Sequence, residues 1–212
     1  MNPIPIPDMN RSLCAVYIDD RLDSISLPEA LDLLPPWRRE KALAYRHDGP
    51  RRQSVAAWLL LRRACQEQLH LADVPRVELA EGGKPYFPDL PQLHFNLSHC
   101  TEAAACALAN KPVGIDIERP RRANESLIRY VMNSQEQRRI QLSTNPDLEF
   151  STIWTQKEAL LKLSGRGLTL DLPPLLLDTG HIHFQTHVHS EGRYVYTLAT
   201  YRSDVVFFPQ KE

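Results

Sequence analysis

The segment Phe150–Lys162 (FSTIWTQKEALLK) constrains the fold more than any other, because it has the spacing of an amphipathic helix whose apolar side must be covered. Its apolar residues share one face: Phe150, Ile153 and Leu161. The adjoining row carries Trp154, Glu158 and Lys162 at intervals of four residues. The pattern predicts a carboxylate and an ammonium beside the buried side of a helix, although Glu158 and Lys162 also fit an ordinary surface ion pair.

The segment Val113–Glu118 (VGIDIE) alternates strictly and predicts a strand. Gly114, Asp116 and Glu118 share one face, and two carboxylates placed so closely repel each other unless a cation lies between them. With Glu158 from the predicted helix they make three oxygen donors, a set that suits Mg2+ and leaves room for phosphate and water. The alternative is the solvated face of an edge strand.

Composition permits one compact domain or two small lobes, because the chain has 212 residues and 42% of them are hydrophobic. The net charge of -1 argues against a general nucleic-acid binder. Positive charge is nevertheless clustered in two places, which are either anion sites or solvated faces. The first cluster comprises Arg38, Arg39, Lys41, Arg46, Arg51 and Arg52, and the second comprises Arg119, Arg121, Arg122 and Arg129.

The four cysteines show no CxxC spacing, and three of them lie among apolar residues: Cys65, Cys100 and Cys106. We expect buried free thiols and a reducing compartment. Residues 1–10 lack the basic and apolar regions of a signal peptide. No apolar run approaches the roughly 20 residues that cross a membrane. These features favour a cytoplasmic protein with no membrane partner.

The rest of the chain predicts helix-rich and then β-rich material twice, before and after about residue 113. Strands are expected at 13–18, 77–79, 93–99, 182–188, 194–201 and 205–208. Helices are expected between 26 and 35 and at 37–45, 51–70 and 124–132. A capping box of Ser134 with Gln137 predicts the start of a further helix. Residues 103–109 are a helix by propensity or a buried strand that could pair with residues 113–118. This arrangement allows two similarly built α+β lobes.

Histidines recur at odd positions near the end of the chain, so they share one face of the expected strand: His181, His183, His187 and His189. Zinc sites usually add a cysteine or a carboxylate, for which only Asp178 and Glu191 lie nearby. We interpret the histidines as the solvated face of an edge strand. A pH-sensitive surface is the alternative.

A third segment, at residues 82–99, allows all three segments to be interpreted together. GKP at residues 83–85 and FNLSH at 95–99 precede GIDIE at 114–118 and WTQKEALLK at 154–162, and GRGL follows at 165–168. In this order and at these spacings the motifs resemble the 4'-phosphopantetheinyl transferases, in particular the two-lobed Sfp type. The resemblance implies an α+β pseudo-dimer of two similar lobes, 1–112 and 113–212, with the active site in the cleft between them. It also implies a monomer.

The resemblance assigns roles to individual residues. Asp116, Glu118 and Glu158 would bind Mg2+, and Glu158 would also take the proton from the incoming serine. Lys162 would steady negative charge on the phosphates, and Lys157 matches a further lysine of the family. The other candidates would bind the phosphates of coenzyme A: Lys84, Ser98, His99, Arg38, Arg39, Lys41 and Arg52.

The implied reaction moves the phosphopantetheine arm of coenzyme A to a serine of an apo acyl, peptidyl or polyketide carrier protein, with adenosine 3',5'-bisphosphate as the by-product. Two other classes could use similar groups: a non-catalytic coenzyme A or nucleotide-binding module, and another Mg2+-dependent phosphohydrolase or nucleotidyl enzyme. Three carboxylates argue against the first class, because binding phosphates alone requires no acids. Cleavage of free coenzyme A without a carrier protein would indicate the second.

Overall fold

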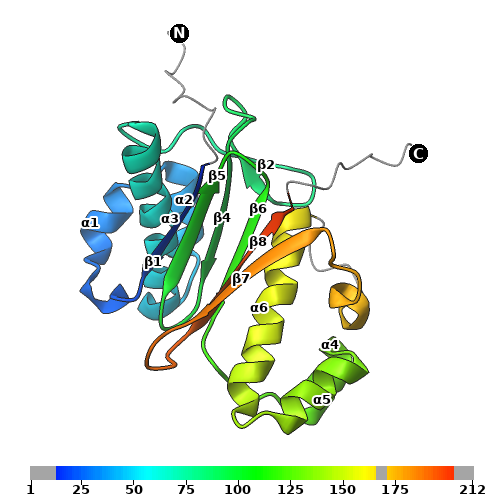
Figure 1. The fold of residues 1–212 in the computed structure, drawn as a ribbon. Coiled ribbons are helices and arrows are strands. Elements are labelled where there is room, and N and C mark those ends of the chain that lie inside the picture. Colours follow the sequence, from blue (N-terminus) through cyan, green and yellow to red (C-terminus); the bar gives the residue numbers. More distant parts are fainter. Residues whose placement is uncertain (1–12, 166–170, 203–212) are drawn as a thin grey trace.

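The computed structural model describes residues 13–165 and 171–202. Figure 1 shows two antiparallel sheets beside each other with helices packed against them. The first sheet contains β1 (Cys14–Asp19), β4 (His94–His99) and β5 (Ala104–Ala109), and the second contains β6 (Val113–Glu118), β7 (Ile182–Val188) and β8 (Val195–Tyr201). The structure therefore confirms the expected α+β class. The expected strand at 205–208 lies outside the described residues.

Helices fill the long connections within each sheet. Between β1 and β4 lie η1 (Leu22–Ser24), α1 (Leu27–Asp32), α2 (Pro36–Leu43), α3 (Asp48–Leu69) and the short strands β2 (Glu78–Leu79) and β3 (Pro85–Tyr86). Between β6 and β7 lie α4 (Glu125–Val131), α5 (Ser134–Leu142), α6 (Pro146–Ser164) and η3 (Pro173–Leu176). In both sheets the strand that follows these helices pairs with the last strand, which is central: the orders are β1-β5-β4 and β6-β8-β7.

The starts of α3 and α5 differ from the prediction. Helix α3 begins at Asp48 rather than Arg51, because Gly49 and Pro50 fit the first turn, where a missing N–H is tolerated. The capping box of α5 uses Asn133 and Glu136, one residue before the expected pair. Asparagine and serine cap helices about equally well, and here Asn133 and Glu136 form both hydrogen bonds of the box.

Residues 104–109 form strand β5, the buried-strand alternative, and not a helix, but they do not pair with residues 113–118 as the sequence allowed. β5 pairs with β1 and β4, whereas β6 pairs with β8. The even positions of β5 pack in a core with α3, and the odd positions pack in a second core with β6. Burial on both faces favours a run of small apolar residues, and it overrides the helix propensity of alanine.

Gly114 allows α6 to lie directly on β6. A Cβ atom at this position would meet the carbonyl oxygen of Ala159 at 2.1 Å and the amide nitrogen of Leu163 at 2.5 Å. Only glycine fits such a contact between two backbones. The helix thereby places the row of Glu158 and Lys162 above the carboxylates of β6.

Lys157 fixes α6 on its other side. Its side chain is fully buried, and its Nζ donates to the carbonyl oxygens of Val131 at 2.8 Å and Leu172 at 2.6 Å. The same ammonium forms an ion pair with Glu136 at 2.8 Å. Lys157 therefore connects α6 to α4, α5 and the segment before η3.

The expectations for the cysteines and for the histidines of β7 agree with the structure. Cys65, Cys100 and Cys106 are buried free thiols, and burial raises the pKa of Cys65 to about 12. His183 and His187 are exposed on β7, as expected for a solvated face. Within the described ranges, no helix has both the length and the apolar composition needed to cross a membrane.

Substituting Gly114 with alanine should lower the free energy of unfolding by about 3 kcal/mol, because neither backbone can yield to a new Cβ without moving the helix. Urea denaturation measures the change. Gly49→Ala is the matched control, since nothing lies within 4 Å of a Cβ at that position. A Gly114→Ala protein as stable as the control would contradict the close packing of α6 on β6.

Lys157→Met should lower the free energy of unfolding by about 3–5 kcal/mol, because it leaves the Glu136 carboxylate buried without its counter-charge. Adding Glu136→Gln removes that charge and keeps an acceptor for the Asn133 amide, so the double variant should regain part of the loss. Urea midpoints of the three proteins compare these effects. A double variant no more stable than Lys157→Met would refute the pairing.

Candidate active site

Asp116 is the most buried of the three candidate metal ligands, with 4% of its surface exposed. Its Oδ1 accepts hydrogen bonds from Ser98 Oγ at 2.8 Å and from Lys162 Nζ at 2.6 Å. Lys162 also donates to Ser98 Oγ at 2.9 Å, so β4, β6 and α6 meet at one carboxylate. The second oxygen of Asp116 is buried and has no hydrogen-bond partner. A buried polar atom left in this way is expected to receive a ligand.

The other two carboxylates have raised pKa values. Burial, and then the negative charge of Asp116, raise the pKa of Glu118 to about 7. The same two causes raise the pKa of Glu158. The positive charge of Lys162 opposes the rise in both. Asp116 therefore lies close enough to repel each of the two glutamates, and a bound cation would relieve this repulsion.

Within residues 13–165 and 171–202, no three His, Cys, Asp or Glu side chains converge closely enough to hold a metal ion. The predicted ligands nevertheless suit Mg2+ in kind, because Asp116, Glu118 and Glu158 supply only carboxylate oxygens. The buried, unpartnered oxygen of Asp116 is an available donor. By donor chemistry and charge, the residues present fit a hard divalent cation.

Three basic residues surround His99 at the end of β4. Burial, followed by the charges of Arg38, Lys162 and Lys41, lowers the pKa of His99 to about 4, so the imidazole is neutral near pH 7. Arg38 is 7% exposed, and it donates to the carbonyl and hydroxyl oxygens of Ser54 at 2.9 and 3.1 Å. Its Nε is buried and has no partner. Cations gathered in this way attract a multiply charged anion.

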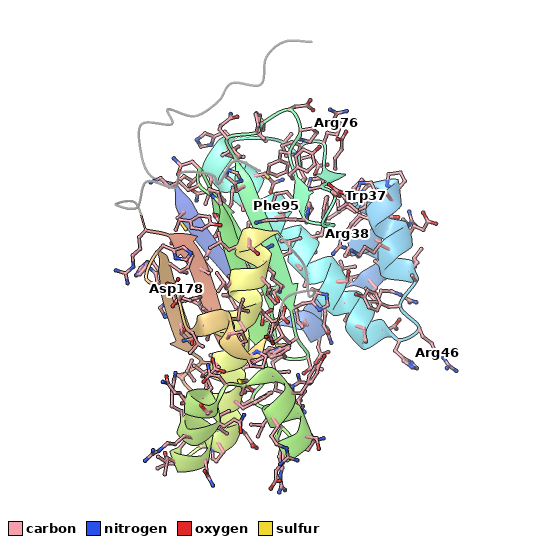
Figure 2. The ribbon with its side chains drawn as sticks, turned by 90° about the vertical axis from the view of Figure 1, so that its right-hand side faces the viewer. Trp37, Arg38, Arg46, Arg76, Phe95 and Asp178 are labelled. Carbon is pink, nitrogen blue, oxygen red and sulfur yellow. The ribbon has the colours of Figure 1, made fainter. Side chains whose placement is uncertain are left out.

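The structure does not bring every predicted phosphate ligand to this group. Arg39 forms an ion pair with Asp32 at 3.1 Å, on an exposed part of the surface. Arg52 lies on α3, where its Nε is buried without a partner. Figure 2 shows Arg46 at the outer edge of the molecule, whereas Arg38 lies nearer its centre.

Lys84 lies against the end of α6. Its Nζ donates to the carbonyl oxygens of Leu163 at 3.0 Å and Val113 at 3.3 Å, and burial lowers its pKa to about 8. A Cβ on the neighbouring Gly82 would meet the carbonyl oxygen of Gly165 at 2.2 Å. Gly165 ends the helix in the left-handed conformation, as the sequence predicted. The loop that contains Gly82 and Lys84 therefore packs closely against the C-terminal end of α6, where the helix dipole favours a cation.

A pocket of about 270 Å3 lies between this loop, β4 and α6. Lys84, Asn96, Glu158 and Lys162 are among the residues that line it. Both halves of the chain thus contribute charged groups to one space.

Asn96 is a residue of this pocket that was not among the predicted site residues. Its side chain is 5% exposed, and its Oδ1 accepts a hydrogen bond from the amide of Ile115 at 2.9 Å. The available signal was its position on the polar face of an alternating strand, between His94 and Ser98. The alternation predicts the face on which Asn96 lies, but it does not predict which backbone amide donates to its Oδ1.

Comparison with known proteins agrees with the motifs. A family model described as the 4'-phosphopantetheinyl transferase superfamily matches residues 112–211. A 4'-phosphopantetheinyl transferase of Bacillus subtilis is 29% identical over 197 residues, covering 89% of this chain and 86% of the relative. The 4'-phosphopantetheinyl transferase Sfp of Bacillus subtilis strain 168 is 28% identical over 183 residues, covering 84% and 77%.

A third relative, the 4'-phosphopantetheinyl transferase AcpT of Escherichia coli K12, is 37% identical over 139 residues, covering 62% of this chain and 66% of the relative. The four motifs occur in the expected order, and the relatives that match most of the chain include Sfp. The chain belongs to the 4'-phosphopantetheinyl transferase superfamily and is of the Sfp type.

Proposed function

We propose that this protein transfers the 4'-phosphopantetheine arm of coenzyme A to a serine of an apo carrier protein of the acyl, peptidyl or polyketide kind. The observation that carries the proposal is the placement of Asp116, Glu118, Glu158 and Lys162 beside a group of basic residues. The names of the relatives support the same reaction. Such a site places negative ligands for a cation next to positive ligands for phosphates.

The reaction exchanges one bond to phosphorus for another. The serine oxygen forms a bond to the phosphorus that carries the pantetheine arm, and the bond from that phosphorus to the bridging oxygen breaks. Adenosine 3',5'-bisphosphate leaves with the bridging oxygen. The serine proton passes to a base, for which we propose the carboxylate of Glu158.

Two features support Glu158 as the base. It lines the pocket between the two halves of the chain, and its pKa is raised by burial and by Asp116. A base works best when its pKa lies nearer to the working pH. Lys162 lines the same pocket, and its fixed charge would stabilise the phosphate oxygens as negative charge spreads over them.

The metal in this proposal is Mg2+, held by Asp116, Glu118 and Glu158. The unpartnered oxygen of Asp116 and the raised pKa values of the two glutamates support the assignment. When bound, Mg2+ would supply positive charge to the diphosphate oxygens. Lys162 would then hold Asp116 and Ser98 in place beside it.

The phosphates of coenzyme A would bind on the first half of the chain. Arg38, Lys41 and His99 are the best supported ligands, because burial lowers the pKa of all three, and the charge of Arg38 lowers the pKa of Lys41 and His99 further; a bound anion would stabilise their charged forms. The remaining proposed ligands are Lys84, Ser98, Arg39 and Arg52. Of these, Lys84 and Ser98 also hold backbone groups of β6, so they would serve binding and structure together.

We further propose that residues 1–112 and 113–212 are two similar lobes with the active site in the cleft between them. The matching strand orders β1-β5-β4 and β6-β8-β7 support this division, because each places a helix-bearing connection before two antiparallel strands. The pocket lined from both halves supports the position of the site. We expect the enzyme to act as a monomer in the cytoplasm.

Asp116→Ala and Glu158→Ala should each lower the carrier-dependent release of adenosine 3',5'-bisphosphate by about 10³-fold, equivalent to losing several kcal/mol of charge stabilisation. Chromatography of the released nucleotide gives the rate. Glu29→Ala, at an exposed position of α1, is the matched control and should keep the full rate. Full activity in both site variants, with an unchanged circular dichroism spectrum, would contradict the proposed site.

Coenzyme A binding at pH 6 should take up on the order of one proton at His99, because a bound phosphate raises the pKa of an imidazole that is neutral beforehand. The folded pKa of about 4 lies below the working pH, so the sign is uptake and not release. Calorimetry in buffers of different ionisation enthalpy measures the protons. His99→Gln should reduce the uptake, and His183→Gln, exposed on β7, should leave it unchanged; equal uptake in all three proteins would exclude His99 as a phosphate ligand.

A further inference from the structure

The two sheets meet at two edge strands, β4 of the first and β6 of the second. Polar side chains of the first half contact the backbone of β6 at this border. The contacts are Lys84 Nζ to Val113 O at 3.3 Å, Asn96 Oδ1 to Ile115 N at 2.9 Å, and Ser98 Oγ to Ile117 N at 3.3 Å. We refer to Lys84, Asn96 and Ser98 as the seam.

The seam follows one edge of β6 with a regular spacing. Its three backbone partners are alternate residues, whose N–H and C=O groups point to the same side of a strand. Asn96 contacts Ile115, and Ser98, two residues further along β4, contacts Ile117, two residues further along β6. The two strands therefore run parallel. Figure 1 shows the two strands next to each other. Side chains therefore cover an edge that would otherwise present unpaired backbone groups.

The register of this edge decides where the carboxylates of β6 point. Asp116 lies between the two amides that Asn96 and Ser98 hold, and a slip of one residue would turn it to the other face. Ser98 also donates to Asp116, so its two functions cannot be separated by substitution. In the part of the chain that the structure describes, Asn96 makes no hydrogen bond to Asp116, so its substitution isolates the effect of the seam.

We propose that Asn96 is a positioning residue for phosphopantetheine transfer, which acts by holding the Ile115 amide and thereby the register of Asp116 opposite the basic residues of the first half. This inference rests on the proposed function. Its claim is that loss of the Asn96 acceptor slows the chemical step while coenzyme A still binds, because the best supported phosphate ligands lie on the first half.

The test compares three variants with the wild-type protein. Asn96→Leu keeps the size of the side chain and removes the acceptor, whereas Asn96→Asp keeps an acceptor oxygen. Asn145→Ala is the matched control, because Asn145 Oδ1 likewise accepts one backbone amide, that of Leu148 at 3.2 Å, at the far end of α6. The measurements are amide hydrogen exchange at Ile115 by NMR, kcat for carrier modification, and the Kd for coenzyme A.

Asn96→Leu should speed exchange of the Ile115 amide by about fivefold or more, as expected for one lost hydrogen bond. It should also lower kcat by about 10²-fold, the scale of a small misplacement of reacting groups, with the Kd for coenzyme A unchanged. Asn96→Asp should retain most of the protection and of kcat. Asn145→Ala should lower the melting temperature and keep kcat.

Three results would overturn the proposal: wild-type kcat in Asn96→Leu, equal losses in the leucine and aspartate variants, or unchanged exchange at Ile115. If Asn96→Leu does not fold, Asn96→Ser takes its place under the same criteria, because its oxygen is one bond too short to replace the acceptor. Absence of transfer by the wild-type protein would refute the proposed function and the positioning role together. The exchange measurement needs neither coenzyme A nor a carrier, so it tests the seam itself in either case.

Discussion

The buried carboxylate of Asp116 is the point on which the arrangement of the site depends. A carboxylate with 4% exposure is costly unless its oxygens are satisfied, and only Oδ1 is satisfied, by Ser98 and Lys162. Those two residues come from a strand of the first sheet and a helix of the second half. The interaction that lowers the cost of burying Asp116 therefore also holds the two halves together at the site.

Close backbone packing makes this interaction possible. Gly114 lets α6 approach β6 closely enough for Lys162 to reach Asp116, and Lys157 holds the other side of the helix through a buried ion pair and backbone carbonyls. Lys84 adds a contact at the C-terminal end of the helix. Lys84 and Lys162 thus join the two halves, whereas Lys157 makes its contacts within the second half, although by charge alone all three would be candidate phosphate ligands.

The sequence predicts the regular elements well where periodicity and burial agree. The alternation at residues 113–118 and 182–188 gives β6 and β7 with the same bounds as the structure. At residues 103–109 the sequence leaves helix and buried strand open, because alanine favours a helix when considered alone and only burial between two cores makes the segment a strand. The start of α3 shifts by three residues because Gly49 and Pro50 fit its first turn, and the cap of α5 shifts by one residue because Asn133 and Ser134 compete as caps.

The sequence predicts that Asp116 and Lys162 lie together, which the structure confirms, but it does not predict the contacts that hold them. Motif spacing brings Asp116, Glu158 and Lys162 together, as a strand followed by a packed helix must. It cannot show that the ammonium of Lys84 donates to carbonyl oxygens 29 and 79 residues further along the chain, or that the Asn96 side chain accepts a hydrogen bond from the amide of Ile115. Such contacts depend on how two edge strands meet, and no local pattern in the sequence encodes that meeting.

The most direct test of the account is intact-mass spectrometry of a small panel of apo carrier proteins incubated with this protein, coenzyme A and Mg2+. The account predicts a gain of one phosphopantetheine on at least one carrier, and loss of that gain when EDTA removes the metal. A panel that contains acyl, peptidyl and polyketide carriers and shows no gain, while coenzyme A remains intact, would contradict it.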